Sequence, residues 1–236
     1  MKQGINLVKR IVLFFIGMTI IQLGVALYLK TNIGSDTFTV FTQGLASTLN
    51  NTGLKDNSIV NLISGGQGVT PGVANMIILA TMFIVILCVE RKRINIGTLI
   101  CVVGVGPIID LGVKIISYFP VESYNIIVRM LLVVFGCFVI AVGFSILSAS
   151  NLGVAPNDIV PFIIVDKTKI EYRWIRIALD AIFLIGGFFL GGKVGIGTVL
   201  SMISTGPFIQ ACLPLGEKFV NMIVNVKENR LTKEAV

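Results

Sequence analysis

Apolar residues are gathered into long runs along the 236-residue chain, with short polar segments between them. A helix that crosses the hydrocarbon core of a membrane needs about 20 mostly apolar residues at ~1.5 Å of rise each. Six runs meet this requirement, approximately residues 11–29, 73–89, 95–117, 125–147, 174–190 and 195–213. The pattern therefore predicts an all-α polytopic membrane protein with six transmembrane helices.

The chain also repeats itself at two fixed spacings. At an offset of 119 residues, Gly17, Gly24, Asn32 and Gly34 fall on residues of the same type at 136, 143, 151 and 153. At an offset of 100, the Ile-Gly-Thr of 96–98 and the Gly-Pro of 106–107 recur at 196–198 and 206–207. Glycines spaced by seven let helices approach closely, so we expect those at 17, 24, 136 and 143 to form contact grooves between the repeats.

The two spacings predict that the chain is a duplication. We expect a first repeat over residues 1–118, a second repeat over 119–216 and a tail over 217–236. The difference between the offsets predicts a 19-residue insertion in the first repeat. We place this polar, glycine-containing insertion at about 49–68, as an external loop.

Lysine and arginine accumulate in the cytoplasmic segments of membrane proteins, so their positions predict the orientation. With six crossings and both termini in the cytoplasm, 14 of the 19 basic residues lie inside and five lie outside. Each repeat then contributes three crossings, and because three is odd the second repeat enters the bilayer from the opposite face. The sequence thus predicts a 3+3 inverted-topology repeat with a cytoplasmic tail, an arrangement that recurs among secondary transporters.

Each repeat is interrupted by a polar segment after its first apolar run, at 32–36 on the predicted outside and at 151–155 on the predicted inside. Non-helical backbone at membrane depth is costly, so a repeated break indicates a functional, broken or re-entrant helix. Pro156 suits the first turn of the second such helix, and Ser35 or Asp36 suits the N-cap of the first. The alternative for residues 37–49 is an interfacial helix, because their apolar side chains fall mostly on one face.

A helix N-terminus carries free N–H groups and a partial positive charge, which favour an anion or a carboxylate. We therefore place the candidate substrate-binding site where the two helix starts converge. Its residues are Ser35, Asp36, Thr37 and Thr39 in the first repeat and Asn157 and Asp158 in the second.

Acidic side chains are rare inside membranes and are candidates for ion or proton coupling. Asp110 lies deep in the third apolar run, and its counterpart at the offset of 100 is Gln210. Asp180, in the fifth run, is a further candidate. The alternative is an ion pair within one helix, since Asp110 precedes Lys114 by four residues and Asp180 follows Arg176 by four.

Composition narrows the classes of function. Apolar residues make up 55% of the chain, charged residues 13%, and the mean hydropathy is +0.93, all far from the averages of soluble proteins. The formal charge of +7 is concentrated at the ends of the apolar runs, so nucleic acid is not an expected partner. The chain has no histidine, its four cysteines lack metal-site spacing, and no enzyme motif is present. We therefore expect no metal, no cofactor and no enzyme activity.

Residues 152–160, Leu-Gly-Val-Ala-Pro-Asn-Asp-Ile-Val, and 191–198, Gly-Gly-Lys-Val-Gly-Ile-Gly-Thr, resemble the YczE/YyaS/YitT group of bacterial integral membrane proteins. In that group the first segment usually reads leucine-glycine-x-glycine or alanine-proline-tryptophan-aspartate. Asn157 replaces the tryptophan here, and the loop of the first repeat has Thr37, Phe38 and Thr39 in place of proline, tryptophan and aspartate. The resemblance covers nearly the whole chain and implies a multi-pass protein of the bacterial cytoplasmic membrane, without implying a substrate.

Two hypotheses for the function remain open. The first is a small secondary transporter or facilitator that moves a small polar or anionic solute through a site between the two inverted repeats. The second is a non-transporting membrane partner or regulator of an export or transport complex, which docks through the outer loop and the basic inner loop. The expected partners are the lipid bilayer and, under the first hypothesis, the solute; a monomer and a homodimer both fit a chain of this size.

Overall fold

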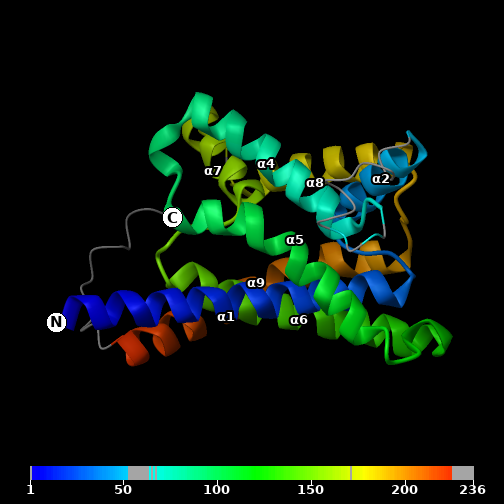
Figure 1. Ribbon diagram of the computed structural model, residues 1–236, viewed down its shortest axis with the longest axis horizontal. Helices are drawn as coiled ribbons and strands as arrows, with labels where there is room; N and C mark the ends of the chain where they lie inside the picture. Colours follow the sequence, from blue (N-terminus) through cyan, green and yellow to red (C-terminus); the bar gives the residue numbers. More distant parts are fainter. Residues whose placement is uncertain (1, 53–63, 65, 67, 171, 225–236) are drawn as a thin grey trace.

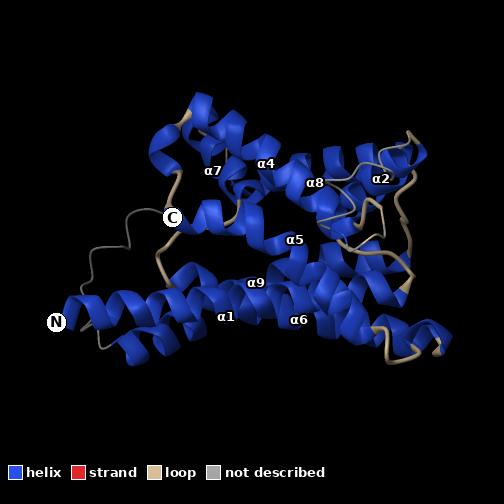
Figure 2. Cartoon of the chain, viewed as in Figure 1, coloured by secondary structure: helices blue, strands red, loops and turns tan. Residues whose placement is uncertain are grey.

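The described residues of the computed structural model, 2–52, 64, 66, 68–170 and 172–224, fold into helices joined by short loops, and no strand occurs among them (Figure 2). In chain order the helices are α1 (Lys2–Thr31), α2 (Thr37–Asn51), α4 (Pro71–Val89), η2 (Arg91–Arg93), α5 (Ile96–Ile116), η3 (Val121–Ser123), α6 (Ile126–Ala149), α7 (Pro156–Thr168), α8 (Tyr172–Phe189) and α9 (Ile196–Val224). The all-α prediction is confirmed for this part of the chain.

Five of these helices are long and apolar enough to cross a membrane: α1 from Asn6 onward, α4, α5, α6 and α9. Each coincides, to within one residue at the start of α5, α6 and α9, with one of the six predicted apolar runs. The remaining run, 174–190, lies in α8, whose apolar part is the shorter segment Ile177–Phe189. The protein is therefore a polytopic membrane protein, and the count of six crossings stays a prediction.

Helices α1, α6 and α9 pack lengthwise as one layer, with α6 between the other two (Figure 1). The contact between α1 and α6 depends on glycines. A Cβ atom on Gly17 would lie 2.8 Å from the carbonyl oxygen of Gly143, and a Cβ on Gly143 would lie 2.8 Å from that of Gly17. A Cβ on Gly24 would likewise lie 3.0 Å from the oxygen of Gly136. The structure thus confirms that these glycines form a close helix contact.

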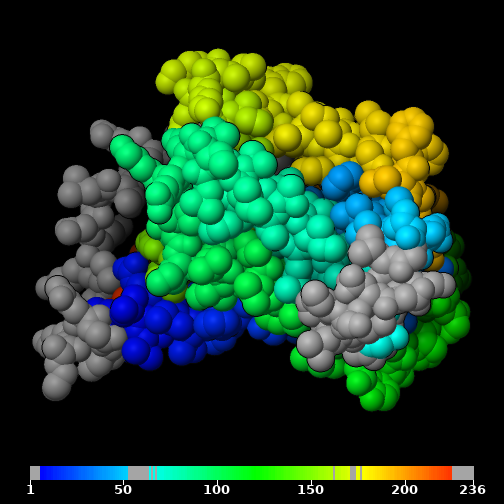
Figure 3. All heavy atoms as spheres, turned by 45° about the horizontal axis from the view of Figure 1, so that its top comes forward, coloured from blue at the N-terminus to red at the C-terminus, as the bar shows by residue number. Residues whose placement is uncertain are grey.

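Helix α5 packs against α1 on one side and α4 on the other, so it joins this layer to a second one. In the space-filling view of Figure 3, α4 and α5 lie side by side over α1, and α8 runs along the edge behind α4. The short helices α2 and α7 both contact α4 and α8 and lie toward opposite ends of α4 (Figure 1). The largest buried apolar cluster lies where the layers meet and contains Phe14, Met18, Leu79, Cys101, Val102, Val105, Ile109 and Leu147.

Polar contacts mark the two ends of the helical layers. At one end, Nζ of Lys9 donates a hydrogen bond to the carbonyl of Ile223 (2.8 Å), and Nη1 of Arg10 donates to that of Ser150 (3.4 Å). Arg93 forms ion pairs with Glu90 and Asp166. Because α1 begins where α9 ends, these two helices run in opposite directions.

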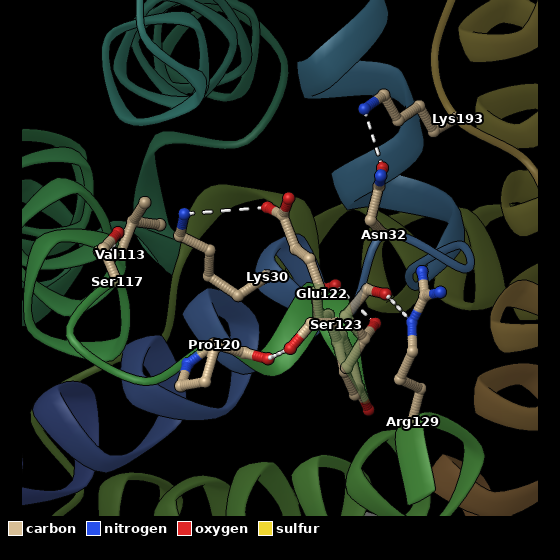
Figure 4. A network of polar contacts seen from close by, with 11 residues as sticks. Lys30, Asn32, Val113, Ser117, Pro120, Glu122, Ser123, Arg129 and Lys193 are labelled. Atoms are coloured by element: carbon tan, nitrogen blue, oxygen red, sulfur yellow. Dashed lines mark hydrogen bonds and ion pairs between the residues drawn. The ribbon is translucent and has the colours of Figure 1, made fainter. Parts of the chain in front are cut away.

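The other end carries a second group of polar contacts (Figure 4). Lys30 forms an ion pair with Glu122 (3.7 Å), and Nε of Arg129 donates to the carbonyl of Thr31, the last residue of α1 (2.6 Å). Nζ of Lys193 donates to Oδ1 of Asn32 (2.7 Å). The loop after α1, the segment before α6 and the turn before α9 therefore meet at this end.

Most of the predicted insertion, residues 53–63, 65 and 67, lies outside the described residues, as do 225–236 of the predicted tail. The described flanks of the insertion are joined by two hydrogen bonds, because Nδ2 of Asn50 donates to the carbonyl of Val69 (2.9 Å) and the Val69 amide donates to Oδ1 of Asn50 (2.8 Å). Residues 49–51 belong to α2, and α9 continues past residue 216 to Val224. The helices thus extend into both segments that were predicted to be a loop and a tail.

Candidate functional site

Helix α2 begins at one of the two predicted helix starts. Asp36 is its N-cap, with extended backbone, and Oδ2 of Asp36 accepts a hydrogen bond from the amide of Thr39 (3.1 Å). The structure thus selects Asp36 rather than Ser35 as the cap. Ser35 is buried, and its hydroxyl has no hydrogen-bond partner among the described residues.

Helix α7 begins at the other predicted start. Pro156 occupies its first turn, as the sequence predicted. An N–H group at this position would have no partner within the helix, so its absence from proline costs nothing. Asp158 follows in the same turn, and Nδ2 of Asn157 lies 3.3 Å from Oδ1 of Asp158. A carboxylate near a helix N-terminus is favourable, so the charge of Asp158 stabilises the start of α7.

The loops that lead into α2 and α7 have the same backbone shape. Asn32 and Asn151 both adopt left-handed conformations, with φ of 53° and 56°. Gly34 and Gly153 follow with φ of 109° and 118°, a region that is strained for any residue with a Cβ atom. The offset of 119 residues seen in the sequence therefore relates backbone conformations as well as residue types.

Each loop is hydrogen-bonded to a helix start from the other predicted repeat. The amide of Gly97, in α5, donates to the carbonyl of Leu152 (3.0 Å), and the amide of Gly197, in α9, donates to the carbonyl of Ile33 (2.8 Å). The contacts leave no room for a side chain, because a Cβ on Gly97 would lie 2.6 Å from the oxygen of Leu152. The glycine of each Ile-Gly-Thr thus lets a loop approach a helix start.

A small cavity lies where α2, α7 and α8 meet. It has about 10 Å³ of space for the centre of a water molecule, which is room for about one water. Phe38 of α2 and Asn157 of α7, which correspond at the offset of 119 residues, both line it. The complete lining is Phe38, Asn157, Pro161, Leu179, Asp180 and Phe183. The two helix starts therefore converge on one cavity.

Asp180 connects this cavity to the start of α2. Its Oδ1 accepts a hydrogen bond from Oγ1 of Thr37, the first residue of α2 (2.9 Å). The rings of Phe38 and Phe183 meet edge to face with centroids 5.2 Å apart, and the rings of Phe41 and Phe183 lie 5.7 Å apart. The side chain of Arg176, the alternative ion-pair partner for Asp180, lies outside the described residues.

Asp110 lies at a different place, against the start of α4. Its Oδ2 accepts a hydrogen bond from Oγ1 of Thr70 (2.5 Å), and its Oδ1 accepts one from the amide of Gly72 (3.2 Å). The ion pairs found among the described residues do not include one between Asp110 and Lys114. Gln210, its counterpart in α9, is exposed on the surface of the bundle. Of the three predicted coupling residues, Asp180 lines the cavity, whereas Asp110 and Gln210 are not among its lining residues.

The structure brings together part of the predicted site. Asn157 and Asp180 line the cavity, and Thr37 is hydrogen-bonded to Asp180. The apolar lining was missed: Phe38, Pro161, Leu179 and Phe183 were not among the predicted site residues. A signal for two lining positions was present, because Phe38 and Asn157 occupy the places where the resembled group carries tryptophan.

Among the described residues, no cluster of three or more His, Cys, Asp or Glu side chains could hold a metal ion.

Comparisons with known proteins give three relatives. The uncharacterized membrane protein YczE of Bacillus subtilis (strain 168) is 29% identical over 130 residues, which cover 55% of this chain and 59% of YczE. An uncharacterized protein of Haemophilus influenzae (strain ATCC 51907 / DSM 11121 / KW20 / Rd) is 24% identical over 202 residues, 86% of this chain and 82% of the relative. The uncharacterized protein YyaS of B. subtilis is 23% identical over 205 residues, 86% of this chain and 92% of YyaS.

These relatives confirm the resemblance to YczE and YyaS, whereas a relation to YitT stays a prediction. No solved structure matches the chain. Residues 8–214 match DUF6198, which is described as a family of unknown function. The matched range includes both helix starts, the cavity and all five long apolar helices except the ends of α1 and α9. The chain is a polytopic membrane protein that belongs to the DUF6198 family.

Proposed function

We propose that this protein is a small secondary transporter or facilitator that carries a small polar solute through a site between two inverted repeats. The observation that carries the proposal is the cavity lined by Phe38 and Asn157, one residue from the start of each short helix. Transporters of inverted-repeat construction place their substrate where discontinuous helices from the two halves meet. Here that meeting point also offers a carboxylate, Asp180, and an amide, Asn157, as polar groups.

The inverted repeat is supported by geometry that agrees with both sequence offsets. The hydrogen bond from Gly97 to Leu152 has its counterpart in the bond from Gly197 to Ile33. In each case the donor comes from one half and the acceptor from the other. A relation of this kind, in which two contacts exchange donors and acceptors, is what a twofold axis between the halves produces.

A difference between the halves supports movement. Helix α5 is packed on α4 so closely that a Cβ on Gly106 would lie 2.5 Å from the oxygen of Gly72. The counterpart of Gly106 in α9 is Gly206, and a Cβ there would meet nothing within 4 Å. The equivalent helices of the two halves are thus packed differently, closely around Gly106 and openly around Gly206. If the halves exchanged these two packing arrangements, the cavity would open to alternate faces of the membrane.

Flux through proteoliposomes tests the proposal. A thermal-shift screen across amino acids, amines, organic anions and sulfur compounds first selects solutes, since a ligand that binds the folded state raises its apparent stability. Wild-type protein should then move a selected solute, while Asn157→Ala and Asp180→Asn should abolish the flux at unchanged protein abundance. Ser117→Ala, a change on the exposed end of α5, is the control. Wild-type flux from both cavity variants would refute a transport site at this cavity.

A second candidate is a non-transporting membrane partner or regulator of an export or transport complex. It is favoured by an open depression of about 550 Å³ at the end of the molecule that contains Asn32 and Lys193, bordered also by Ile126, Phe188 and Ile196. A docked protein segment would fit such a wide, shallow surface better than a small solute would. Co-purification from the native membrane should then recover a second protein in fixed ratio, and Lys193→Glu should release it.

A further inference from the structure

Basic side chains gather at the end of the molecule where α4 and α7 finish. Arg91 and Lys92 lie in η2, directly after α4. Lys167 lies in the last turn of α7, and Lys169 directly follows that helix. All four side chains are exposed, and together we call them the basic patch.

The two segments that carry the basic patch are in contact, although they belong to different predicted repeats. Arg93 of η2 forms an ion pair with Asp166 of α7. Ile94, which follows η2, packs against an apolar cluster that contains Ile163 of α7. Figures 1 and 3 show the end of α4 next to α7. The four cations therefore share one region of the surface.

The nearby acidic residues do not neutralise the basic patch. Glu90 and Asp166 both pair with Arg93, and Oε1 of Glu90 lies 3.3 Å from Nε of Arg93. The ion pairs found among the described residues include none of the four patch residues. Residues 90–93 and 166–173 together hold six basic and three acidic side chains, so the region is positive in total. Like charges that share a surface repel one another, and an external anion would relieve this repulsion.

Three basic residues at the opposite end of the molecule have partners within the chain (Figure 4). Lys30, Arg129 and Lys193 bind a carboxylate, a backbone carbonyl and a side-chain amide oxygen, respectively. These contacts hold loops and helix ends together. The cations of the basic patch have no such role among the described residues, which leaves them available to a partner outside the chain.

Apolar side chains beside the basic patch indicate which anion it binds. Val89 ends α4 and Ile96 begins α5, two helices that are long and apolar enough to cross a membrane. Val89, Ile96 and Ile170, which follows Lys169, are all exposed. The patch therefore lies at the boundary between hydrocarbon and water. A phospholipid matches this boundary, because its phosphate lies at the level of the cations and its acyl chains lie at the level of the apolar residues.

We propose that the basic patch binds the headgroup phosphates of anionic phospholipids, while their acyl chains contact the exposed apolar residues beside it. Basic residues close to the ends of membrane helices attract anionic lipids, and each adds to the binding. Lipid bound here would contact η2 and the end of α7 together and so stabilise the contact between them. This site is separate from the cavity, and the inference holds whether or not the protein transports a solute.

Thermal unfolding of the full-length protein in micelles of a neutral detergent tests the inference. Short-chain phosphatidylglycerol should raise the unfolding temperature and reach saturation, whereas phosphatidylcholine with the same acyl chains should not. Glycerol phosphate, which has an anionic group but no acyl chains, should give a much smaller shift. Sodium chloride should weaken the effect of phosphatidylglycerol, since salt screens exposed charges. Micelles present the lipid to both ends of the protein, so the result does not depend on its orientation in the cell.

A double variant locates the site. Lys92→Gln combined with Lys167→Gln removes one charge from each segment and should raise the phosphatidylglycerol concentration at half of the shift by about tenfold or more. Without lipid, its unfolding temperature should be no lower than that of wild type, because neither side chain is in an ion pair among the described residues. Lys114→Gln combined with Lys218→Gln is the matched control, since it removes the same charge from exposed positions of α5 and α9. This control should respond to phosphatidylglycerol as wild type does.

Three results would overturn the inference. The first is an equal response to phosphatidylglycerol in wild type and in the Lys92 and Lys167 double variant. The second is equal stabilisation by phosphatidylcholine or by glycerol phosphate, which would mean that the charged headgroup or the acyl chains are not needed. The third is equal stabilisation by polyglutamate without lipid, which would assign the basic patch to an acidic protein segment instead.

Discussion

Oγ1 of Thr70 lies 2.5 Å from Oδ2 of Asp110, and the same hydroxyl accepts a hydrogen bond from the amide of Val73 (3.1 Å). One side chain thus caps α4 and connects its start to α5. Thr70→Val removes both hydrogen bonds and leaves the Asp110 carboxylate with one partner fewer. We expect a loss of about 1–3 kcal/mol in the free energy of unfolding, measured by denaturation in detergent micelles. Thr70→Ser keeps the hydroxyl and should retain most of the stability; equal stability of the valine and serine variants would contradict this role.

Gly97→Ala and Gly197→Ala test the two contacts between loops and helix starts. The added methyl groups would lie 2.6 Å and 2.5 Å from the carbonyl oxygens of Leu152 and Gly34, so helix and loop must separate. Overpacking of this kind costs about 1–3 kcal/mol, and both variants should unfold at lower temperature than wild type. Gly206→Ala adds the same methyl group where nothing lies within 4 Å and should leave the unfolding temperature within error.

Labelling of single cysteines tests the membrane topology. In a Cys88→Ser background, which removes the exposed native thiol, Lys92→Cys should react with a membrane-impermeant maleimide only after the cells are permeabilised. Tyr118→Cys and Val194→Cys should both react in intact cells, because Tyr118 and Val194 lie at the end that the basic residues assign to the outside. Protection of residue 194 in intact cells would mean that α8 does not cross the membrane, and the arrangement of three plus three crossings would fail.

Arg129 and Lys30 should contribute unequally to stability, although both make polar contacts at the same end (Figure 4). Nε of Arg129 reaches the carbonyl of Thr31 at the C-terminus of α1, where a positive charge is favourable. Arg129→Met should cost about 1.5–3 kcal/mol, the range for a hydrogen bond from a charged group. Lys30→Met should cost about 0–1 kcal/mol, because its partner Glu122 is largely exposed. Chemical denaturation of both variants under one condition measures the difference.

Local rules predicted much of the fold. The apolar runs located the five long helices. A helix that crosses the hydrocarbon core needs a minimum length of apolar sequence, and few other segments of the chain reach that length. Pro156 was predicted at the start of α7, and Ser35 or Asp36 at the start of α2, because capping depends on two or three neighbouring residues. The glycines at 17 and 143 were identified by their spacing, and the structure brings them into contact.

The remaining features depend on residues that are distant in sequence. Thr37 meets Asp180 across 143 positions, and no pattern along the chain connects them. For Asp110, spacing along one helix offered Lys114 as an alternative partner, whereas the start of α4 supplies Thr70 and Gly72. The lining phenylalanines were missed because an aromatic residue in an apolar run looks the same whether it faces lipid, core or cavity.

The exchanged backbone contacts also determine when the protein can reach its final form. The carbonyl of Ile33 receives its hydrogen bond from an amide that is synthesised 164 positions later, at Gly197. During biosynthesis, the loop that contains Ile33 therefore lacks the hydrogen bond from Gly197 until almost the entire chain has been inserted. Until α9 is inserted, insertion factors or lipid headgroups can shield the Ile33 carbonyl. In a chain that stops before α9, this carbonyl never receives its hydrogen bond from Gly197.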